Sequence, residues 1–338
     1  MSCNKDPDET DPNTSESIFN NGLLVLNEGL FQQNNSTLSW IDLTSDEVTN
    51  QVFLAQNNRP LGDTGNDMGN YGSKIYIVVN ASSTIEVVDK SSLKSIKQIS
   101  LQLNNQGQQP RSIEFYDGKA YISSYDGYVN VLDTSSLTIV DRIEVGANPE
   151  GITTSDGYLY VSNSGGLSFP DVDSTVFKVD LNSNLVIDTF IVGNNPGDID
   201  SDLQGDLYVV KRGDYSSNDP SELIRISNNG VITNTGISAS SIKRHGEYLY
   251  ISYYNYDNGE GQIQVYDMIQ ESIVTSNLID ASLVQTLYGA IPDDNGSVYA
   301  LDAMSFTNSG YIREFSSSGS IIQSFHVGLN PTKLIIYD

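Results

Sequence analysis

The chain has 338 residues, of which 43 are acidic and 17 are basic, so its formal net charge at pH 7 is −26. A surface this acidic repels phosphate backbones and anionic lipid, which argues against nucleic-acid binding and a polybasic membrane patch. Charged residues make up only 18% of the chain and no apolar run approaches the ~18 residues that span a bilayer, so disorder and transmembrane helices are excluded. The apolar content of 38% suits a β-rich protein built of thin layers.

Residues 1–17 are rich in Asp, Asn, Thr, Ser and Pro and show no apolar periodicity, so we predict a flexible tether. This segment holds Cys3, the single cysteine of the chain, which excludes an intramolecular disulfide and a cysteine-based metal site. Cys3 is either a free thiol on a cytosolic tail or the acylated cysteine of a bacterial lipoprotein whose signal peptide has been removed. A cysteine followed by a linker and a folded domain favours the lipoprotein, with lipidation at Cys3.

A short apolar string recurs along the rest of the chain. Its copies begin at Leu24, Tyr76, Tyr121, Tyr160, Tyr208, Tyr250 and Tyr299. The mean spacing is about 46 residues, and dividing the chain after residue 17 into seven parts also gives about 46. The sequence therefore predicts seven repeats of one structural unit, forming a single domain over residues 18–338.

The third repeat shows the internal order of a unit. Residues 110–115 alternate between apolar and polar, and Asp117 and Gly118 form a tight hairpin turn. Residues 119–145 supply three further short strands, separated by Gly, Asp and Ser turns. No stretch of the chain has a sustained 3.6-residue period, so we expect negligible helix. Such units describe an all-β, seven-bladed β-propeller of four-stranded antiparallel blades, with the single tryptophan, Trp40, in its core.

Proline opens the expected innermost strand of several repeats. The last such strand, residues 331–337, ends the chain, whereas the first repeat begins with its second strand at Leu23. We therefore expect the C-terminal strand to join the N-terminal blade and close the ring, which removes free sheet edges. An open solenoid is the alternative, but it has no need to join its two ends. The prolines are Pro60, Pro110, Pro149, Pro196 and Pro331.

The junctions between repeats carry a recurring Gly-x-x-Pro pattern, at residues 146–149, 193–196 and 328–331. This pattern resembles the Val-Gly-x-x-Pro junction of YVTN-type (YncE-like) bacterial surface propellers. Together with the start of the chain, including the acidic run at residues 5–9, it resembles propeller lipoproteins that sit over TonB-dependent outer-membrane transporters. The resemblance implies a cell-surface protein of the outer membrane that captures cobalamin or an iron-siderophore and delivers it to such a transporter.

In an antiparallel blade with strands a, b, c and d, the b–c loops and d–a junctions emerge on one face of the ring. Several predicted b–c loops are longer than a tight turn requires, and such loops often carry function. These long loops cover residues 28–36, 164–174, 212–221, 255–261 and 303–310. The aromatic residues of this face are Phe31, Tyr125, Tyr128, Phe169, Tyr215, Tyr254, Tyr256 and Phe306. Aromatic planes among Asn, Asp and Ser suit a large, semi-polar ligand.

Basic residues also gather on this face of a very acidic chain, which points to an anionic group on the ligand. They are Arg59, Arg111, Lys211 and Arg212. The predicted ligand-binding residues are therefore Phe31, Arg59, Arg111, Tyr125, Tyr128, Phe169, Arg212, Tyr215, Tyr254, Tyr256 and Phe306.

Catalysis finds little support in the sequence. The two histidines, His245 and His326, are expected in an a–b turn and in an outermost strand, far from each other and from the loop-rich face. This argues against a Ser-His-Asp triad, a histidine acid/base and a histidine metal site. We predict a non-enzymatic protein without cofactor that binds a corrinoid, with siderophore or haem binding and a carboxylate-dependent hydrolase or lyase as alternatives. Residues 198–206 resemble a calcium loop, but their strand register spreads the Asp side chains along a strand.

Overall fold

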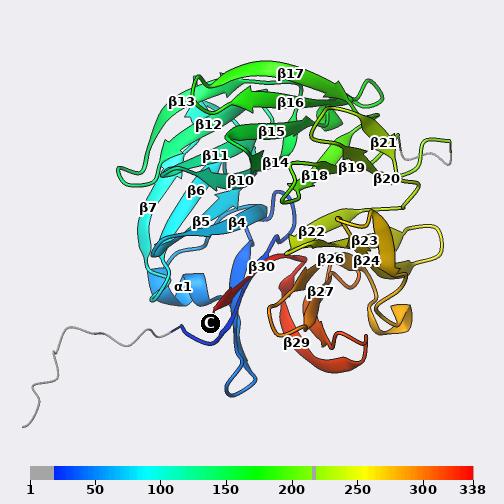
Figure 1. The fold of residues 1–338 in the computed structure, drawn as a ribbon. Coiled ribbons are helices and arrows are strands. Elements are labelled where there is room, and N and C mark those ends of the chain that lie inside the picture. Colours follow the sequence, from blue (N-terminus) through cyan, green and yellow to red (C-terminus); the bar gives the residue numbers. More distant parts are fainter. Residues whose placement is uncertain (1–18, 215–217, 338) are drawn as a thin grey trace, which may run out of the picture.

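Figure 1 shows the computed structural model of the protein, which describes residues 19–214 and 218–337. These residues form seven four-stranded sheets arranged as blades around a central axis. Every pair of neighbouring strands within a blade is antiparallel, for example β10 (Pro110–Tyr116) with β11 (Lys119–Ser124). The predicted seven-bladed β-propeller is therefore confirmed.

The blades are numbered 1 to 7 from the one that contains the N-terminal strand. The innermost strands a are β30 (Pro331–Tyr337), β4 (Gly65–Tyr71), β10, β14 (Pro149–Ser155), β18 (Pro196–Ser201), β22 (Ser241–His245) and β26 (Leu287–Pro292). The strands b are β1 (Gly22–Asn27), β5 (Lys74–Val79), β11, β15 (Tyr158–Asn163), β19 (Leu207–Lys211), β23 (Tyr248–Asn255) and β27 (Val298–Asp302).

The strands c are β2 (Thr37–Asp42), β6 (Thr84–Asp89), β12 (Tyr128–Asp133), β16 (Thr175–Asp180), β20 (Glu222–Ile226), β24 (Glu260–Asp267) and β28 (Ser309–Phe315). The outermost strands d are β3 (Glu47–Thr49), β7 (Ser95–Ser100), β13 (Thr138–Glu144), β17 (Leu185–Ile191), β21 (Ile232–Asn234), β25 (Ser272–Thr275) and β29 (Ile321–Leu329). The remaining elements are α1 (Val52–Asn57), the hairpin β8 (Gln102–Leu103) and β9 (Gln106–Gly107), and the 3-10 turns η1 (Gly166–Ser168) and η2 (Ala281–Leu283).

Helix is nearly absent from the described residues, as predicted, and no helix among them is long and apolar enough to cross a membrane. The short helix α1 has no counterpart in the other blades and was not predicted. It buries Val52 and Phe53 in the junction between blades 1 and 2.

The ring is closed by its two ends. Strand β30 pairs antiparallel with β1, with Leu334 opposite Val25 and Ile335 opposite Leu24, and the two ends lie side by side in Figure 1. The predicted closure is therefore confirmed. Trp40, 6% exposed, packs edge-on against the ring of Tyr337, so the closing strand also enters the core, as expected for the tryptophan.

Proline opens four innermost strands, β10, β14, β18 and β30, as predicted. The prediction was wrong for Pro60, because β4 begins only at Gly65. Between these two residues Leu61 turns into the core, and Gly62 forms an isolated bridge with Ser36 of the neighbouring blade. The intervening residues are therefore held by blade 1 and cannot join the ladder of blade 2.

The tyrosine of the repeated string acts as a spacer between blades. Tyr76 of blade 2 is fully buried, and its hydroxyl donates to the carbonyl of Thr134 in blade 3 at 3.4 Å. Tyr208 of blade 5 is equally buried and donates to Met268 of blade 6 at 3.5 Å. A buried tyrosine gains from apolar contact only if its hydroxyl has a partner. The repeat therefore encodes both the strand and its contact with the next blade.

Candidate functional site

We call the face that carries the b–c loops and d–a junctions the loop face, and the opposite face the turn face. Near the loop face, the pairing of most innermost strands with strand b of the same blade is irregular. In β10 the register shifts between Pro110 and Ile113, so Arg111 and Ser112 together oppose one residue of β11. A β-bulge of this kind bends the strand and re-aims a side chain.

Six of the seven innermost strands shift register near their loop-face end, and β22 is the one described strand a that does not. The residues released from the ladder by these shifts include Asn66, Arg111, Glu150, Gly197, Asp198, Tyr288 and Thr332. Because the strands surround one axis, the shifts turn several polar side chains toward the same opening.

Serines of the repeated string fix two of these bulges. The Ser123 hydroxyl accepts the backbone N–H of Ser112 at 3.1 Å and donates to the carbonyl of Glu150 in the next blade at 2.6 Å. Ser162 repeats the pattern one blade further and donates to the carbonyl of Gly197 at 2.5 Å. The bulges of blades 3, 4 and 5 are thus tied to one another, so their side chains are presented by a rigid frame.

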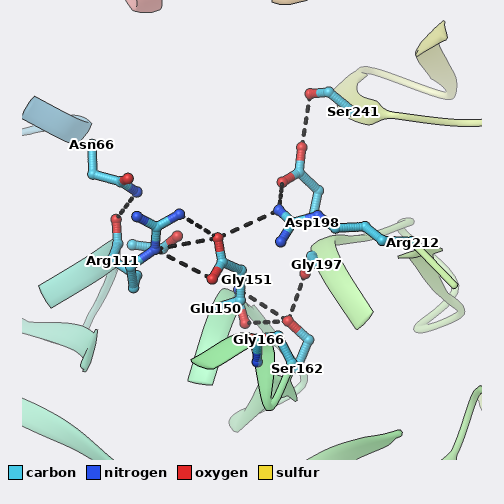
Figure 2. A network of polar contacts seen from close by, with 12 residues as sticks. Asn66, Arg111, Glu150, Gly151, Ser162, Gly166, Gly197, Asp198, Arg212 and Ser241 are labelled. Atoms are coloured by element: carbon cyan, nitrogen blue, oxygen red, sulfur yellow. Dashed lines mark hydrogen bonds and ion pairs between the residues drawn. The ribbon is translucent and has the colours of Figure 1, made fainter. Parts of the chain in front are cut away.

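Glu150 is the centre of a charged cluster that joins the loop-face ends of blades 3, 4 and 5 (Figure 2). Its carboxylate accepts from Arg111 Nη2 at 2.5 Å and from Arg111 Nε at 3.2 Å. It also accepts from Arg212 Nη2 at 3.4 Å and from the Tyr125 hydroxyl at 2.6 Å. Arg212 Nη2 in turn lies 4.0 Å from Asp198 Oδ1. We call these five residues the mouth network.

The charges of the mouth network are fixed by their mutual contacts. Burial of Glu150, whose side chain is 5% exposed, would raise its pKa, but the charges of Arg111 and Arg212 and its hydrogen bonds lower the pKa to about 2. Burial likewise opposes the charge of Arg111, yet Glu150 raises the pKa of that guanidinium overall. Burial and the neighbouring carboxylate raise the pKa of Tyr125. At neutral pH the two guanidinium groups and Glu150 are therefore ionised, and Tyr125 keeps its proton.

The two arginines retain unused hydrogen-bond donors. A guanidinium group has three nitrogens that carry N–H groups. Within residues 19–214 and 218–337, neither Nη1 of Arg111 nor Nε and Nη1 of Arg212 has a hydrogen-bond partner. The two side chains are 19% and 27% exposed. Pre-oriented donors at a partly exposed opening can receive an acceptor group from a ligand.

A second polar pair lies beside the mouth network. Tyr288, released by the bulge of β26, donates to Glu28 Oε2 at 2.9 Å. Burial raises the pKa of Glu28, although the Tyr288 hydrogen bond and the charge of Arg111 both lower it. Phe306 packs edge-on against Tyr288, with ring centroids 5.9 Å apart. This side of the opening therefore combines aromatic surface with a carboxyl group that binds its proton more readily than usual.

Closer to the turn face, Glu114 of β10 accepts from the Thr154 hydroxyl at 3.2 Å. Burial raises the pKa of Glu114 to about 7, and the charges of Asp200 and Asp67 act in the same direction, whereas Lys243 opposes them. These groups come from the innermost strands of four other blades. Glu114 therefore lies among side chains of the innermost strands that surround the axis.

Three of the predicted binding residues, Arg111, Tyr125 and Arg212, meet in the mouth network. Phe306 reaches the opening through its contact with Tyr288. Tyr254 and Tyr256 pack against each other with ring centroids 4.9 Å apart, and Tyr256 is close enough to Tyr288 to help raise its pKa.

Other predicted binding residues lie elsewhere. Arg59 turns to the outer strands of blade 2, where it pairs with the buried carboxylate of Glu86 at 2.8 Å. Tyr128 lies under Arg142, 4.1 Å from the ring centroid, on the outer strands of blade 3. Neither side chain reaches the mouth network, because Arg59 is bound to the carboxylate of Glu86 and Tyr128 packs against the guanidinium group of Arg142. The other predicted positions are Phe31 and Phe169, which are 65% and 57% exposed on their loops, and Tyr215 and Cys3, which lie outside the described residues.

Sequence reasoning missed Glu150, Glu28, Asp198 and Tyr288 as parts of the opening. A signal for Glu150 was present, because Glu150 follows Pro149 as Arg111 follows Pro110 in the previous repeat. Aligning the repeats on their prolines would have placed the two opposite charges side by side.

The histidines lie away from this opening, where the sequence predicted them. His245 ends β22 at the turn face, 3.4 Å from Asp294, and His326 lies in the outermost strand β29 against Tyr311. No group of three or more His, Cys, Asp or Glu side chains within the described part of the chain could hold a metal ion.

Two cavities, of about 350 and 300 Å³, open on the turn face. The larger lies between blades 5 and 6 and is lined by Arg225, whose Nε donates to Asp206 at 2.7 Å and whose Nη1 donates to Glu271 at 2.8 Å. The remaining nitrogen, Nη2, pairs with the same two carboxylates. The guanidinium group of Arg225 is therefore fully used within the protein.

A closed ring of seven four-stranded blades defines this chain as a β-propeller protein. The sequence matches one family over residues 21–290, and the chain belongs to that family, which is described as a domain of unknown function (DUF5074). No curated protein matches the chain significantly.

Solved structures resemble the chain in fold. A quinoprotein alcohol dehydrogenase-like protein from Bacteroides thetaiotaomicron has a TM-score of 0.71 at 13% identity, covering 94% of this chain and 78% of that one. A protein proposed to be a 6-phosphogluconolactonase, from Bacteroides uniformis, has a TM-score of 0.65 at 12% identity over 93% and 99% of the two chains. Hydrazine synthase from Kuenenia stuttgartiensis has a TM-score of 0.63 at 14% identity over 79% and 88%. At these identities the likeness concerns the propeller fold alone.

Proposed function

We propose that this propeller is a non-enzymatic binding protein that captures a small molecule at the mouth network. The observation that carries the proposal is a set of N–H donors on Arg111 and Arg212 that have no hydrogen-bond partner among the described residues. Glu150 holds both side chains in place. Guanidinium groups recognise carboxylate and phosphate oxygens. Tyr288 and Phe306 add flat apolar surface beside them. The ligand we propose therefore has an acidic group and a sizeable apolar body.

The first candidate cargo is a corrinoid such as cobalamin, and the alternatives are a ferric siderophore and haem. This order rests on the resemblance of the Gly-x-x-Pro junctions to those of YVTN-type surface propellers. The same resemblance underlies the proposed partner, a TonB-dependent outer-membrane transporter, and the proposed location, a surface lipoprotein anchored through Cys3. Cys3 lies outside the described residues.

The test is titration of the purified protein with cyanocobalamin, haemin and a ferric tris-catecholate, followed by calorimetry and visible spectroscopy. We expect one of the three to bind and Arg111→Ala to weaken its binding about tenfold or more, because a charged hydrogen bond is lost. Arg142→Ala is the matched control, since Arg142 pairs with Asp126 away from the mouth network. Binding of none of the three, or equal loss in both variants, would contradict the proposal.

A carboxylate-dependent enzyme is the second candidate function. It is favoured by one observation: Glu28 has a raised pKa and Glu150 a lowered one, and the charge of Arg111 acts on both carboxyl groups. Carboxyl groups with separated pKa values can act as acid and base in one reaction. Turnover of chromogenic lactones, esters or glycosides that disappears in Glu28→Gln would favour the enzyme over the binding protein.

A further inference from the structure

Arg212 lies face-on over the backbone of Gly197. A Cβ atom built on Gly197 would lie 2.6 Å from Cζ, 2.6 Å from Nε and 2.7 Å from Nη2 of Arg212. Nearly equal distances to three atoms of one plane mean that the position lies above that plane. The bulge position that holds Arg111 in blade 3 and Glu150 in blade 4 thus holds glycine in blade 5, and the guanidinium plane of Arg212 fills the space.

The known contacts of Arg212 in the described part of the chain account for one face and one edge of its guanidinium group. Gly197 covers one face, and Nη2 points toward Glu150 and Asp198. The side chain is nevertheless 27% exposed. Because Gly197 and the two carboxylates occupy the other sides, the opposite face and the edge that carries Nη1 are where a ligand could approach. Arg111 differs, because the ring of Tyr125 lies against it with 4.8 Å between Cζ and the ring centroid.

A guanidinium plane with one covered and one open face is a surface for stacking. Arginine stacks on aromatic and other flat conjugated groups, because its weakly hydrated plane loses little on contact. A lysine at the same place would keep the positive charge without offering a plane. The ion pairs to Glu150 and Asp198 hold the plane in one orientation, so its ordering is not left to the ligand.

We propose that the mouth network selects planar conjugated acids. Their ring system would stack on the open face of Arg212, and their acidic group would accept hydrogen bonds from the N–H groups of Arg111. This inference rests on the proposed ligand-binding function and narrows its ligand class. It favours flat ring systems over globular cargo such as a tris-catecholate complex, in which no single ring plane is presented.

The test compares two carboxylic acids with the same ring skeleton, flat 2-naphthoate and puckered decahydro-2-naphthoate, by ligand-observed NMR titration. We expect the flat acid to bind the unmodified protein about fivefold tighter or more, since stacking distinguishes the two. In Gly197→Ala the added methyl group displaces the guanidinium, and in Arg212→Lys the plane is lost. Both variants should bring the ratio of the two affinities close to one.

Gly197→Ala is expected to fold, because the atoms nearest its new methyl group belong to the end of a flexible side chain and its φ lies outside the left-handed region. Thermal unfolding checks this, and Arg142→Lys serves as the control that keeps the preference for the flat acid. Equal affinity for both acids, no binding of either, or a preference that survives in both variants would overturn the inference. These outcomes would not contradict the proposed capture of a larger cargo through Arg111, because that proposal is tested separately by the titration with cyanocobalamin, haemin and the ferric tris-catecholate.

Discussion

Two arginine clusters on opposite faces of the ring use the same chemistry to different ends. On the turn face, all three nitrogens of Arg225 are bonded to Asp206 and Glu271. On the loop face, Glu150 engages part of two guanidinium groups, whose other donors have no partner in the described part of the chain. A saturated arginine joins blades together, whereas an arginine with spare donors is prepared for an external acceptor. The two clusters differ in how many carboxylates each guanidinium group donates hydrogen bonds to: Arg225 has two, whereas Arg111 and Arg212 share Glu150. The number of charged residues in the sequence does not show this difference.

The largest effect is expected from Glu150→Ala, which removes the anion that both loop-face arginines share. Unpairing a buried charge cluster costs about 3 kcal/mol, so the free energy of unfolding should fall by about that amount. Urea unfolding at pH 7 measures it. Glu150→Gln is the matched control and should cost less, because the amide oxygen still accepts hydrogen bonds. A loss below 1 kcal/mol in Glu150→Ala would show that the cluster adds little to stability.

The next effect separates the two clusters directly. Arg225→Met leaves the nearly buried Asp206 without its cation, so we expect a loss of about 2 kcal/mol in stability and unchanged ligand binding. Arg212→Met should do the opposite, costing less than about 1 kcal/mol while weakening capture, because its ion pairs are long. Urea unfolding and ligand titration of both variants test this contrast. If the two variants lost similar amounts of stability and of ligand affinity, the contrast would be refuted.

A smaller effect is expected from Tyr125→Phe. The hydroxyl donates to Glu150 at 2.6 Å, and its loss should cost about 1 kcal/mol. The same hydrogen bond helps to lower the pKa of Glu150, so that pKa should rise in the variant. Carbon-detected NMR of the Glu150 carboxyl group during an acid titration gives the answer, and an unmoved pKa would assign the low value to the arginines alone.

A separate, pH-dependent effect is expected from Glu114, which lies among side chains of the innermost strands. The folded-state pKa of Glu114 is raised to about 7, so folding favours its protonated form. Its contribution to stability is therefore full below the ordinary glutamate pKa of about 4.5 and is lost as pH rises to about 7. Glu114→Gln should flatten stability over this window, as seen by thermal melts between pH 4.5 and 8. An unchanged pH profile would mean that Glu114 titrates as it does in the unfolded chain.

The sequence predicts the ring and only part of the opening. Regular spacing from Tyr76 to Tyr299 counts the blades, and Pro331 marks the strand that closes them, because each signal is local and repeated. The opening depends on register shifts such as the one between Pro110 and Ile113, which are properties of two paired strands. For the same reason Arg59 and Arg111 read alike in sequence, although only Arg111 reaches the mouth network.

The pairing of β1 with β30 also affects how the protein is made. When β1 leaves the ribosome, its partner is about 300 residues away from being translated. The nascent chain therefore carries an open strand edge until β30 has been translated, and a chaperone that shields this edge would protect it from pairing with other chains.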